Sequence, residues 1–159
     1  MNWKTHIAFG LFAALVSFRL FKMNWLMTGI FFVVVTIATL MPDIDKPESK
    51  FGRRTGILSK IVSLLFGHRG IMHSVWLLVA IPAVLWLFIN RIIAWAFFIG
   101  YGAHLLSDSL TLMGVNWFHP FRFLRTHGMI ETGTIGETIV FLIMVIANVV
   151  FGLHLFGLF

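Results

Sequence analysis

The sequence predicts an all-α membrane protein, a polytopic bundle of about five transmembrane helices in a single domain covering residues 1–159. Hydrophobic residues make up 59% of the chain and charged residues only 11%, whereas soluble domains are roughly half apolar and a quarter charged. The mean hydropathy is +0.95, and several apolar runs approach the ~20 residues that a helix needs to cross a bilayer. The chain has no cysteine, which excludes disulfides, thiolate metal ligands and cysteine nucleophiles.

Hydropathy places the five spans in chain order, with polar linkers between them. They are Ile7–Phe21, Trp25–Met41, Ile71–Asn90, Ile92–Met113 and Glu137–Phe159. The first is short and has basic flanks, as a signal peptide would, but the chain re-enters apolar sequence at Trp25. Pro42 lacks a backbone N–H and disfavours helical geometry at Met41, so the second span is expected to end there.

A short interfacial helix is expected in the linker between the second and third spans. The segment "GILSKIVSLLFG" (56–67) is too short to cross a membrane, and its apolar residues recur at helical spacing with Ser59, Lys60 and Ser63 between them. Apolar and polar residues on opposite faces of a short helix are typical of a helix that lies in the membrane surface.

The distribution of basic residues predicts the orientation. Nine lysines and arginines lie on the face with the N-terminus and three on the other, so the positive-inside rule puts the N-terminus in the cytoplasm. We therefore expect a multi-pass protein of the inner or plasma membrane. The net charge of +6 is spread beside apolar runs rather than concentrated in one block, which favours lipid headgroups as partners and predicts no nucleic-acid partner.

Histidines and acids are concentrated on the predicted cytoplasmic side. They open or close spans there, and only His154 lies at the far face. Convergence on one site explains this better than scattered solubilising groups. The candidates are His6, Asp43, Asp45, His68, His73, His104, Asp108 and Glu137.

The segment "GYGAHLLSDSLTLMG" (100–114) carries the sharpest local pattern. His104 and Asp108 are four residues apart, so on a helix they share one face. Ionisable residues inside a span are costly and indicate function, and imidazole with carboxylate suits zinc or another divalent first-row metal. The alternative is a pair that merely satisfies its own burial.

Two further segments supply partners. In "PDID" (42–45) the proline blocks continuation of the preceding helix, and Asp43 and Asp45 would point different ways if the segment is extended, one towards a metal and the other behind it or towards a second metal. A turn in which both bind local backbone is the alternative. In "GHRGIMHS" (67–74) His68 and Arg69 precede the third span and His73 is expected in its first turn, where Arg69 and helix N–H groups could hold a phosphate. Arg69 could instead extend to lipid headgroups.

Other polar residues carry weaker expectations. His119 in "WFHPF" is expected in an aromatic belt more than as a ligand, and His127 and Glu131 share four-residue spacing in a glycine-containing loop. Glu137 could simply be an acid at a helix N-terminus.

His6 together with "PDID", "HRGIMHS", "GYGAHLLSDSLT" and "TGTIGE" resembles the family of membrane-bound metal-dependent hydrolases, which includes SOS-regulated inner-membrane proteins of bacteria. The resemblance covers nearly the whole chain, and that family is distantly similar to zinc-dependent phospholipase C. It implies His6, Asp45, His73, His104 and Asp108 as metal ligands, with Asp43, His68 and Glu137 as further motif positions.

From the residues and this resemblance we expect a membrane-embedded hydrolase with one or two divalent ions, zinc first. Its substrate would be a phosphoester of a phospholipid or lipid-linked phosphate at the cytoplasmic face. Asp108 would bridge two ions, Arg69 would hold the phosphate, and Glu137 or the non-ligating aspartate would accept the proton of the attacking water. The alternatives are a structural or regulatory metal protein without catalysis and a metal or proton carrier, which would need polar groups across the whole membrane.

The orientation can be tested with single cysteines, because the native chain has none. Lys50→Cys and Arg125→Cys should be shielded from an impermeant thiol reagent in intact cells, whereas Arg91→Cys should be labelled. The reverse labelling pattern would place the histidines and acids outside the cytoplasm.

Overall fold

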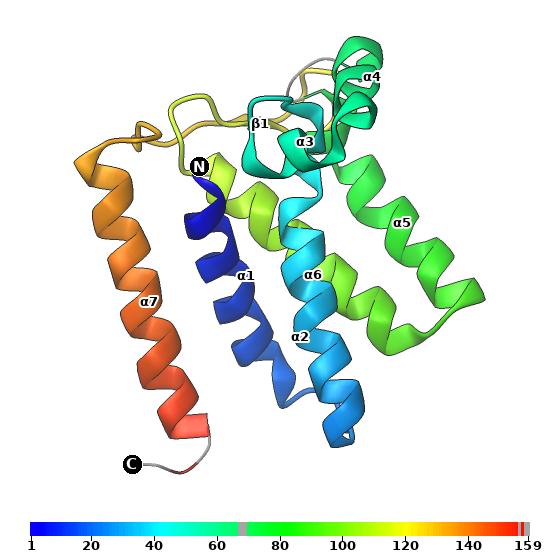
Figure 1. Ribbon diagram of the computed structural model, residues 1–159, viewed down its shortest axis with the longest axis vertical. Coiled ribbons are helices and arrows are strands. Elements are labelled where there is room, and N and C mark those ends of the chain that lie inside the picture. Colours follow the sequence, from blue (N-terminus) through cyan, green and yellow to red (C-terminus); the bar gives the residue numbers. More distant parts are fainter. Residues whose placement is uncertain (67–69, 156, 158–159) are drawn as a thin grey trace.

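The computed structural model describes residues 1–66, 70–155 and 157, and the described chain is mostly helical (Figure 1). Short 3-10 helices are labelled η. The elements are α1 (Trp3–Phe18), α2 (Trp25–Leu40), η1 (Pro42–Asp45), α3 (Lys50–Thr55), α4 (Ile57–Phe66), η2 (Ile71–His73), α5 (Val75–Phe88), α6 (Arg91–Ser109), β1 (Val115–Asn116), β2 (Arg125–Thr126) and α7 (Ile135–Leu155).

Within the described residues, a helix forms at each of the five segments predicted to span the membrane. Two stretches are long and apolar enough to cross a bilayer by length and composition, Trp25–Asp45 and Ile135–Leu155. The helices α1 and α5 are apolar but shorter. The prediction of a helical fold is thus confirmed, since the described residues are mostly helical with only the short β1–β2 pair as strand, while the number of transmembrane helices stays a prediction.

Three predicted boundaries are wrong in ways that affect the site. Helix α1 begins at Trp3, so His6 lies inside the helix instead of before it. Ser74 is extended (φ −122°, ψ 159°), so His73 lies in η2 and α5 starts only at Val75. Helix α6 ends at Ser109 instead of Met113, because Thr111 bridges to Ile130 in the following loop.

Helix α6 is the central element of the bundle. It contacts α1, α2 and α5, and α7 packs mainly on α1. Figure 1 shows the N-terminus together with η1, α3, α4 and the β1 segment at one end of these helices, and the C-terminus at the opposite end. The predicted grouping of polar segments at one end is therefore seen in the fold.

Close packing where α1, α2 and α6 meet depends on two glycines. A Cβ on Gly10 would lie 2.3 Å from Thr39 Oγ1, and one on Gly100 would lie 2.3 Å from the carbonyl oxygen of Val35. The Thr39 hydroxyl lies 2.8 Å from the Val35 carbonyl and 3.1 Å from the Gly100 carbonyl, so it binds across α2 and α6. Small residues that allow backbones to approach are typical of helix contacts in membranes.

The predicted short helix between the second and third spans is confirmed as α4. Its Ile57 and Leu64 side chains are exposed (77% and 86%), while Ser59 is buried and donates to the carbonyl oxygen of Ile44 at 2.6 Å. Ser59 thus fastens α4 to the turn that carries Asp43 and Asp45. The position of α4 in the membrane surface remains a prediction.

The two glycines of α6 provide a matched test of this packing. Gly100→Ala should destabilise the protein by about 1–3 kcal/mol, because its Cβ meets the α2 backbone. Gly102→Ala should be neutral or stabilising, since a Cβ there lies 3.7 Å from Leu78 Cδ1 and alanine favours a helix. Thermal unfolding in detergent measures both, and equal effects would contradict the close approach of α6 to α2.

Candidate metal centre

Three histidines and one aspartate come together at the polar end of the bundle. His6 is on α1, His73 on η2, and His104 and Asp108 on α6. The three histidines have no exposed surface and Asp108 is 1% exposed. The structure thus brings together residues from three segments that are far apart in the sequence.

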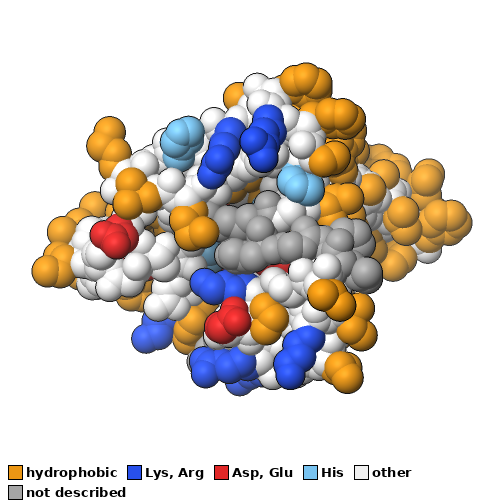
Figure 2. Space-filling view, turned by 90° about the horizontal axis from the view of Figure 1, so that it is seen from above, with side chains coloured by type: hydrophobic (Ala, Val, Ile, Leu, Met, Phe, Trp, Pro, Cys, Tyr) orange, Lys and Arg blue, Asp and Glu red, His pale blue; other side chains and the backbone are white. Residues whose placement is uncertain are grey.

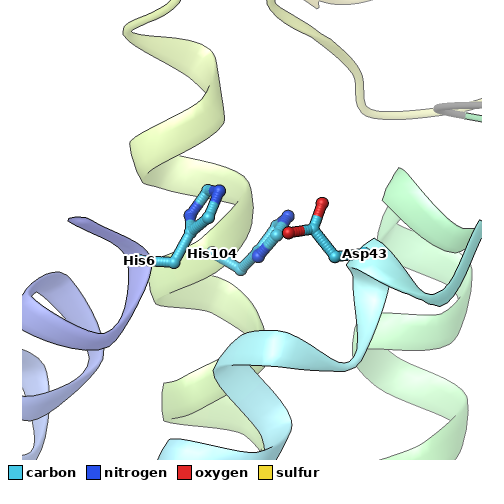
Figure 3. A group of neighbouring side chains, drawn as sticks. All are labelled: His6, Asp43 and His104. Atoms are coloured by element: carbon cyan, nitrogen blue, oxygen red, sulfur yellow. The ribbon is translucent and has the colours of Figure 1, made fainter. Parts of the chain in front are cut away.

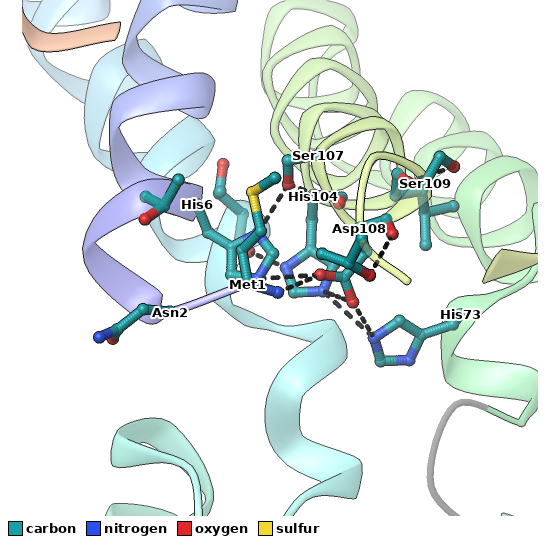
Figure 4. Close-up of polar contacts among 12 residues, drawn as sticks. Met1, Asn2, His6, His73, His104, Ser107, Asp108 and Ser109 are labelled. Carbon is teal, nitrogen blue, oxygen red and sulfur yellow. Dashed lines mark hydrogen bonds and ion pairs between the residues drawn. The ribbon is translucent and has the colours of Figure 1, made fainter. Parts of the chain in front are cut away.

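Asp108 is the centre of this group (Figure 4). Its Oδ1 lies 3.4 Å from His6 Nε2, and its Oδ2 lies 3.6 Å from His73 Nε2 and 3.9 Å from His104 Nε2. The amino group of Met1 also forms an ion pair with Oδ1. Each of the three rings therefore presents its Nε2 atom to the same carboxylate.

The Nδ1 atoms of His104 and His73 face hydrogen-bond acceptors on the other side of each ring. His104 Nδ1 is 2.7 Å from the carbonyl oxygen of Thr39, which can only accept, so Nδ1 carries the proton. His73 Nδ1 is 3.0 Å from Asp45 Oδ2 and donates to it. Hydrogen bonding at Nδ1 directs the Nε2 lone pair of a neutral imidazole towards a metal, as is common for metal-binding histidines.

His6 is oriented in the same way by Ser107. The Ser107 hydroxyl donates to the His104 carbonyl oxygen at 2.8 Å, so it accepts from His6 Nδ1, which lies 2.7 Å away. His6 Nε2 is buried and has no hydrogen-bond partner in the part of the chain that the structure describes. The His6 ring also stacks on His104 with centroids 3.9 Å apart.

The spacing of these atoms suits a small divalent ion. The Nε2 atoms of His73 and His104 are 3.2 Å apart, and the distances to Asp108 are 3.4–3.9 Å. Ligand atoms on a tetrahedral zinc, with Zn–N bonds of 2.0–2.1 Å, lie about 3.3 Å from one another. Two imidazole lone pairs held this close repel unless a cation, either a metal ion or a proton, lies between them.

A second group of possible ligand atoms comprises His6, Asp43 and His104 (Figure 3), and these atoms lie within 4.8 Å of one another. His73, His104 and Asp108 form another such group, so His104 belongs to both. Asp43 is 8% exposed and lines a pocket of about 370 Å³, together with Lys46 and Arg53. The two aspartates of "PDID" thus differ in place, because Asp45 lies behind His73 whereas Asp43 reaches the group and its entrance. The expectation of an extended segment is wrong, since these residues form the 3-10 helix η1 with Pro42 in its first turn, where a missing N–H is tolerated.

Glu137 has a different environment. Its Oε1 accepts from the backbone N–H of Asn2 and, at 3.0 Å, from the Thr5 hydroxyl, while Oε2 accepts from the Gly133 N–H at 2.7 Å. These bonds join the start of α7 to the start of α1. Glu137 belongs to neither group of possible ligands among the described residues.

The remaining candidates lie elsewhere. His68 and Arg69 fall outside the described residues, so their predicted roles stay predictions. His127, Glu131 and His154 are exposed. His119 lines a different pocket, which contains Arg122 and Arg125.

Two residues that orient the histidines were not identified from the sequence. Ser107 could have been found, because it adjoins Asp108 and follows His104 by three residues within a helix. Thr39 acts through its carbonyl oxygen, which every residue has, so no pattern of side chains could indicate it.

Comparison with known proteins gives one family. The model of the YdjM inner membrane protein family matches residues 1–158. The chain is 37% identical over 93 residues to inner membrane protein YdjM of Escherichia coli (strain K12), covering 55% of this chain and 47% of that protein. It is 33% identical over 106 residues to the protein YvsG of Bacillus subtilis (strain 168), covering 65% of this chain and 66% of that protein.

The chain thus spans less than two thirds of the length of these curated relatives. No solved structure matches it. The matches support the membrane-protein part of the resemblance noted in the sequence. Hydrolase activity, zinc and likeness to phospholipase C remain predictions.

Metal binding can be measured directly. Purified protein should retain stoichiometric divalent metal, with zinc expected first, and His104→Ala or Asp108→Ala should remove it because both residues hold the centre of the group. His154→Ala is the control, since that exposed side chain lies in the last turn of α7 at the opposite end. Elemental analysis that finds no metal in the wild type, or equal loss in all three variants, would contradict this site.

Proposed function

Because the chain belongs to the YdjM inner membrane protein family, we propose that it is a multi-pass membrane protein with a metal-dependent hydrolase site at one membrane face. The expected orientation puts that face in the cytoplasm, and the substrate class is a phosphoester of a phospholipid or lipid-linked phosphate. Five spans are proposed, with the shorter α1 and α5 and the tilted α6 crossing alongside α2 and α7.

One observation carries the proposal of a metal. Three buried imidazoles have Nδ1 turned to an acceptor and Nε2 turned to Asp108. The Met1 amino group compensates Oδ1 of Asp108, but three buried Nε2 atoms facing one carboxylate remain costly unless a cation also lies among them. We therefore assign His6, His73, His104 and Asp108 as ligands of one or two ions, with zinc as the first candidate.

A divalent ion bound there would supply Lewis-acid chemistry, making a bound water a better nucleophile and polarising a phosphoryl oxygen. The protein's own contribution is to hold the ligands rigidly and keep most of the site away from bulk water. The side chain of Asp108 lies between His6 and His73 and could bridge two ions.

The two aspartates of η1 are proposed to have different roles. Asp45 accepts a hydrogen bond from His73 Nδ1–H and fixes that ring, so we assign it a positioning role instead of ligation. Asp43 reaches both the ligand group and the pocket, so we assign it to accept the proton of the attacking water. Both oxygens of Glu137 bind groups at the starts of α1 and α7, so we assign Glu137 to the fold rather than to proton transfer.

The pocket offers cationic side chains to a phosphate, beside two acidic ones. Lys46 and Arg53 line it together with Asp43 and Glu48, and cationic side chains bind phosphate through charge-assisted hydrogen bonds. Arg69 is proposed to hold the phosphate as well, on the basis of the sequence alone. A site at the end of the helices, near the exposed apolar face of α4, lies at the depth of lipid headgroups if the bundle spans the membrane.

A carrier function is less well supported. A path through the membrane needs polar groups at every depth, but apart from Asn148 of α7, which donates to the Ala8 carbonyl, the buried polar and charged side chains of the described residues lie near one end of the bundle. They are Thr5, His6, Thr39, Asp43, Asp45, Ser59, His73, Ser74, His104, Ser107, Asp108, Thr111 and Glu137.

Turnover and metal content together test the enzyme proposal. Protein reconstituted in liposomes would be assayed for headgroup or phosphate release from a panel of phospholipids and lipid-linked phosphates. Asp43→Asn should keep its metal but lose about a hundredfold or more in turnover, as expected for a lost general base. His104→Ala should lose both.

Glu48→Gln is the matched control, because Glu48 lines the same pocket and the change is the same carboxylate-to-amide substitution. It should keep both metal and turnover. If wild type and His104→Ala are indistinguishable on the whole panel while only the wild type holds metal, the protein is a structural or regulatory metal protein.

A further inference from the structure

A second polar pocket lies in the loop between α6 and α7, apart from the metal centre. It has a volume of about 400 Å³ and is lined by residues of the β1–β2 hairpin and its flanks, among them Asn116, His119, Arg122 and Arg125. It shares no residue with either group of possible metal ligands. Binding of a metal at those groups therefore does not account for this pocket.

The charges of this pocket favour an anion. Both Arg122 and Arg125 line it, and no acidic side chain does. Neither guanidinium forms an ion pair or hydrogen bond within the described part of the chain. Arginine presents a planar set of donors that matches the oxygens of a phosphate, so two arginines at one pocket suit a phosphate group well.

The side chain of Asn116 independently indicates that the ligand carries a hydrogen-bond donor. Its side-chain Oδ1 is buried and has no hydrogen-bond partner among the residues that the structure describes. A buried acceptor without a donor is costly, so a ligand with a donor next to its phosphate would satisfy it. Ethanolamine and glycerol headgroups carry such a donor, whereas the choline headgroup does not.

The hairpin around the pocket carries residues that are typical of the membrane–water interface. Phe121, Phe123 and Leu124 are exposed (54%, 82% and 48%), and the two phenylalanine rings stack at 5.5 Å. Exposed aromatic residues beside arginines are typical of the headgroup level. Figure 2 looks onto this end of the molecule, where Lys and Arg side chains gather among apolar ones.

The hairpin is held firmly against the start of α5. The Val75 N–H donates to the Trp117 carbonyl oxygen at 2.7 Å, and Trp76 Nε1 donates to the His119 carbonyl oxygen at 3.0 Å. The indole of Trp117 in turn donates to Thr126 Oγ1 at 2.9 Å. A pocket whose walls are fixed in this way is ready to bind a ligand without a large ordering cost.

We propose that this pocket binds the headgroup of a membrane phospholipid. Arg122 and Arg125 hold the phosphate, Asn116 accepts from an ethanolamine or glycerol donor, and Phe121 and Phe123 lie against the acyl region. This site stands independently of the metal centre and of any hydrolase activity.

Native mass spectrometry of the detergent-purified protein, titrated with single lipids, tests the proposal. Phosphatidylethanolamine and phosphatidylglycerol should bind the wild type more tightly than phosphatidylcholine. Arg122→Ala/Arg125→Ala should weaken both by about tenfold or more, because charge-assisted hydrogen bonds are lost. Asn116→Ala should remove the preference over phosphatidylcholine.

Arg54→Ala/Lys60→Ala is the matched control, since it removes two exposed charges from α3 and α4 at the same end. It should leave lipid binding nearly unchanged, and the thermal unfolding temperature in detergent should be nearly unchanged in all variants, which shows that they fold. If both double variants weaken lipid binding equally, the lipids bind through non-specific electrostatic attraction, and the proposed site is contradicted. Binding of inorganic phosphate or glycerol 3-phosphate as tight as that of the lipids would overturn the lipid assignment in favour of a soluble phosphate.

Discussion

The burial of one carboxylate, Asp108, constrains the rest of this structure. A charged group at the end of an apolar helix is expensive unless positive charge or hydrogen-bond donors surround it. Asp108 is 1% exposed, and His6, His73 and His104 lie around it. The Met1 amino group pairs with Oδ1 of Asp108 and supplies one positive charge. The Nδ1 atoms of the three histidines face oxygen atoms of other residues, which leaves their Nε2 atoms and Oδ2 of Asp108 for a further cation.

Close helix packing makes this arrangement possible. His6 on α1 and His104 on α6 stack, and both helices pack closely on α2, at Gly10 with Thr39 and at Gly100 with Val35. Thr39 takes part in both the packing and the site. Its hydroxyl donates to the Gly100 carbonyl, and its own carbonyl accepts from His104 Nδ1–H. The packing of the bundle and the orientation of a ligand thus depend on the same residue.

Much of this architecture could be predicted from the sequence, because hydrophobic runs and helix-breaking residues act locally. The helices, the amphipathic α4 and the grouping of histidines and acids at one end follow from such patterns. The break at Ser74 could not be predicted, because it depends on the contact of Val75 with the Trp117 carbonyl, which lies far along the chain. The different surroundings of Asp43, Asp45 and Glu137 are likewise set by tertiary contacts, and two aspartates in one short motif look equivalent in sequence.

The loop after α6 joins the two proposed sites through the backbone. The Thr111 hydroxyl donates to the carbonyl oxygen of Asp108 at 2.7 Å, and the Thr111 carbonyl accepts from the N–H groups of Gly114 and Gly128, each at 3.0 Å. Gly114 has a positive φ of 65°, and a Cβ there would lie 1.8 Å from the Thr126 carbonyl oxygen, so glycine is required where the two sides of the hairpin meet. The hairpin that carries the phosphate pocket is therefore fixed to the residue at the centre of the metal group. A headgroup bound by Arg122 and Arg125 would be held at a defined position relative to Asp108, which is what a site acting on membrane lipids requires.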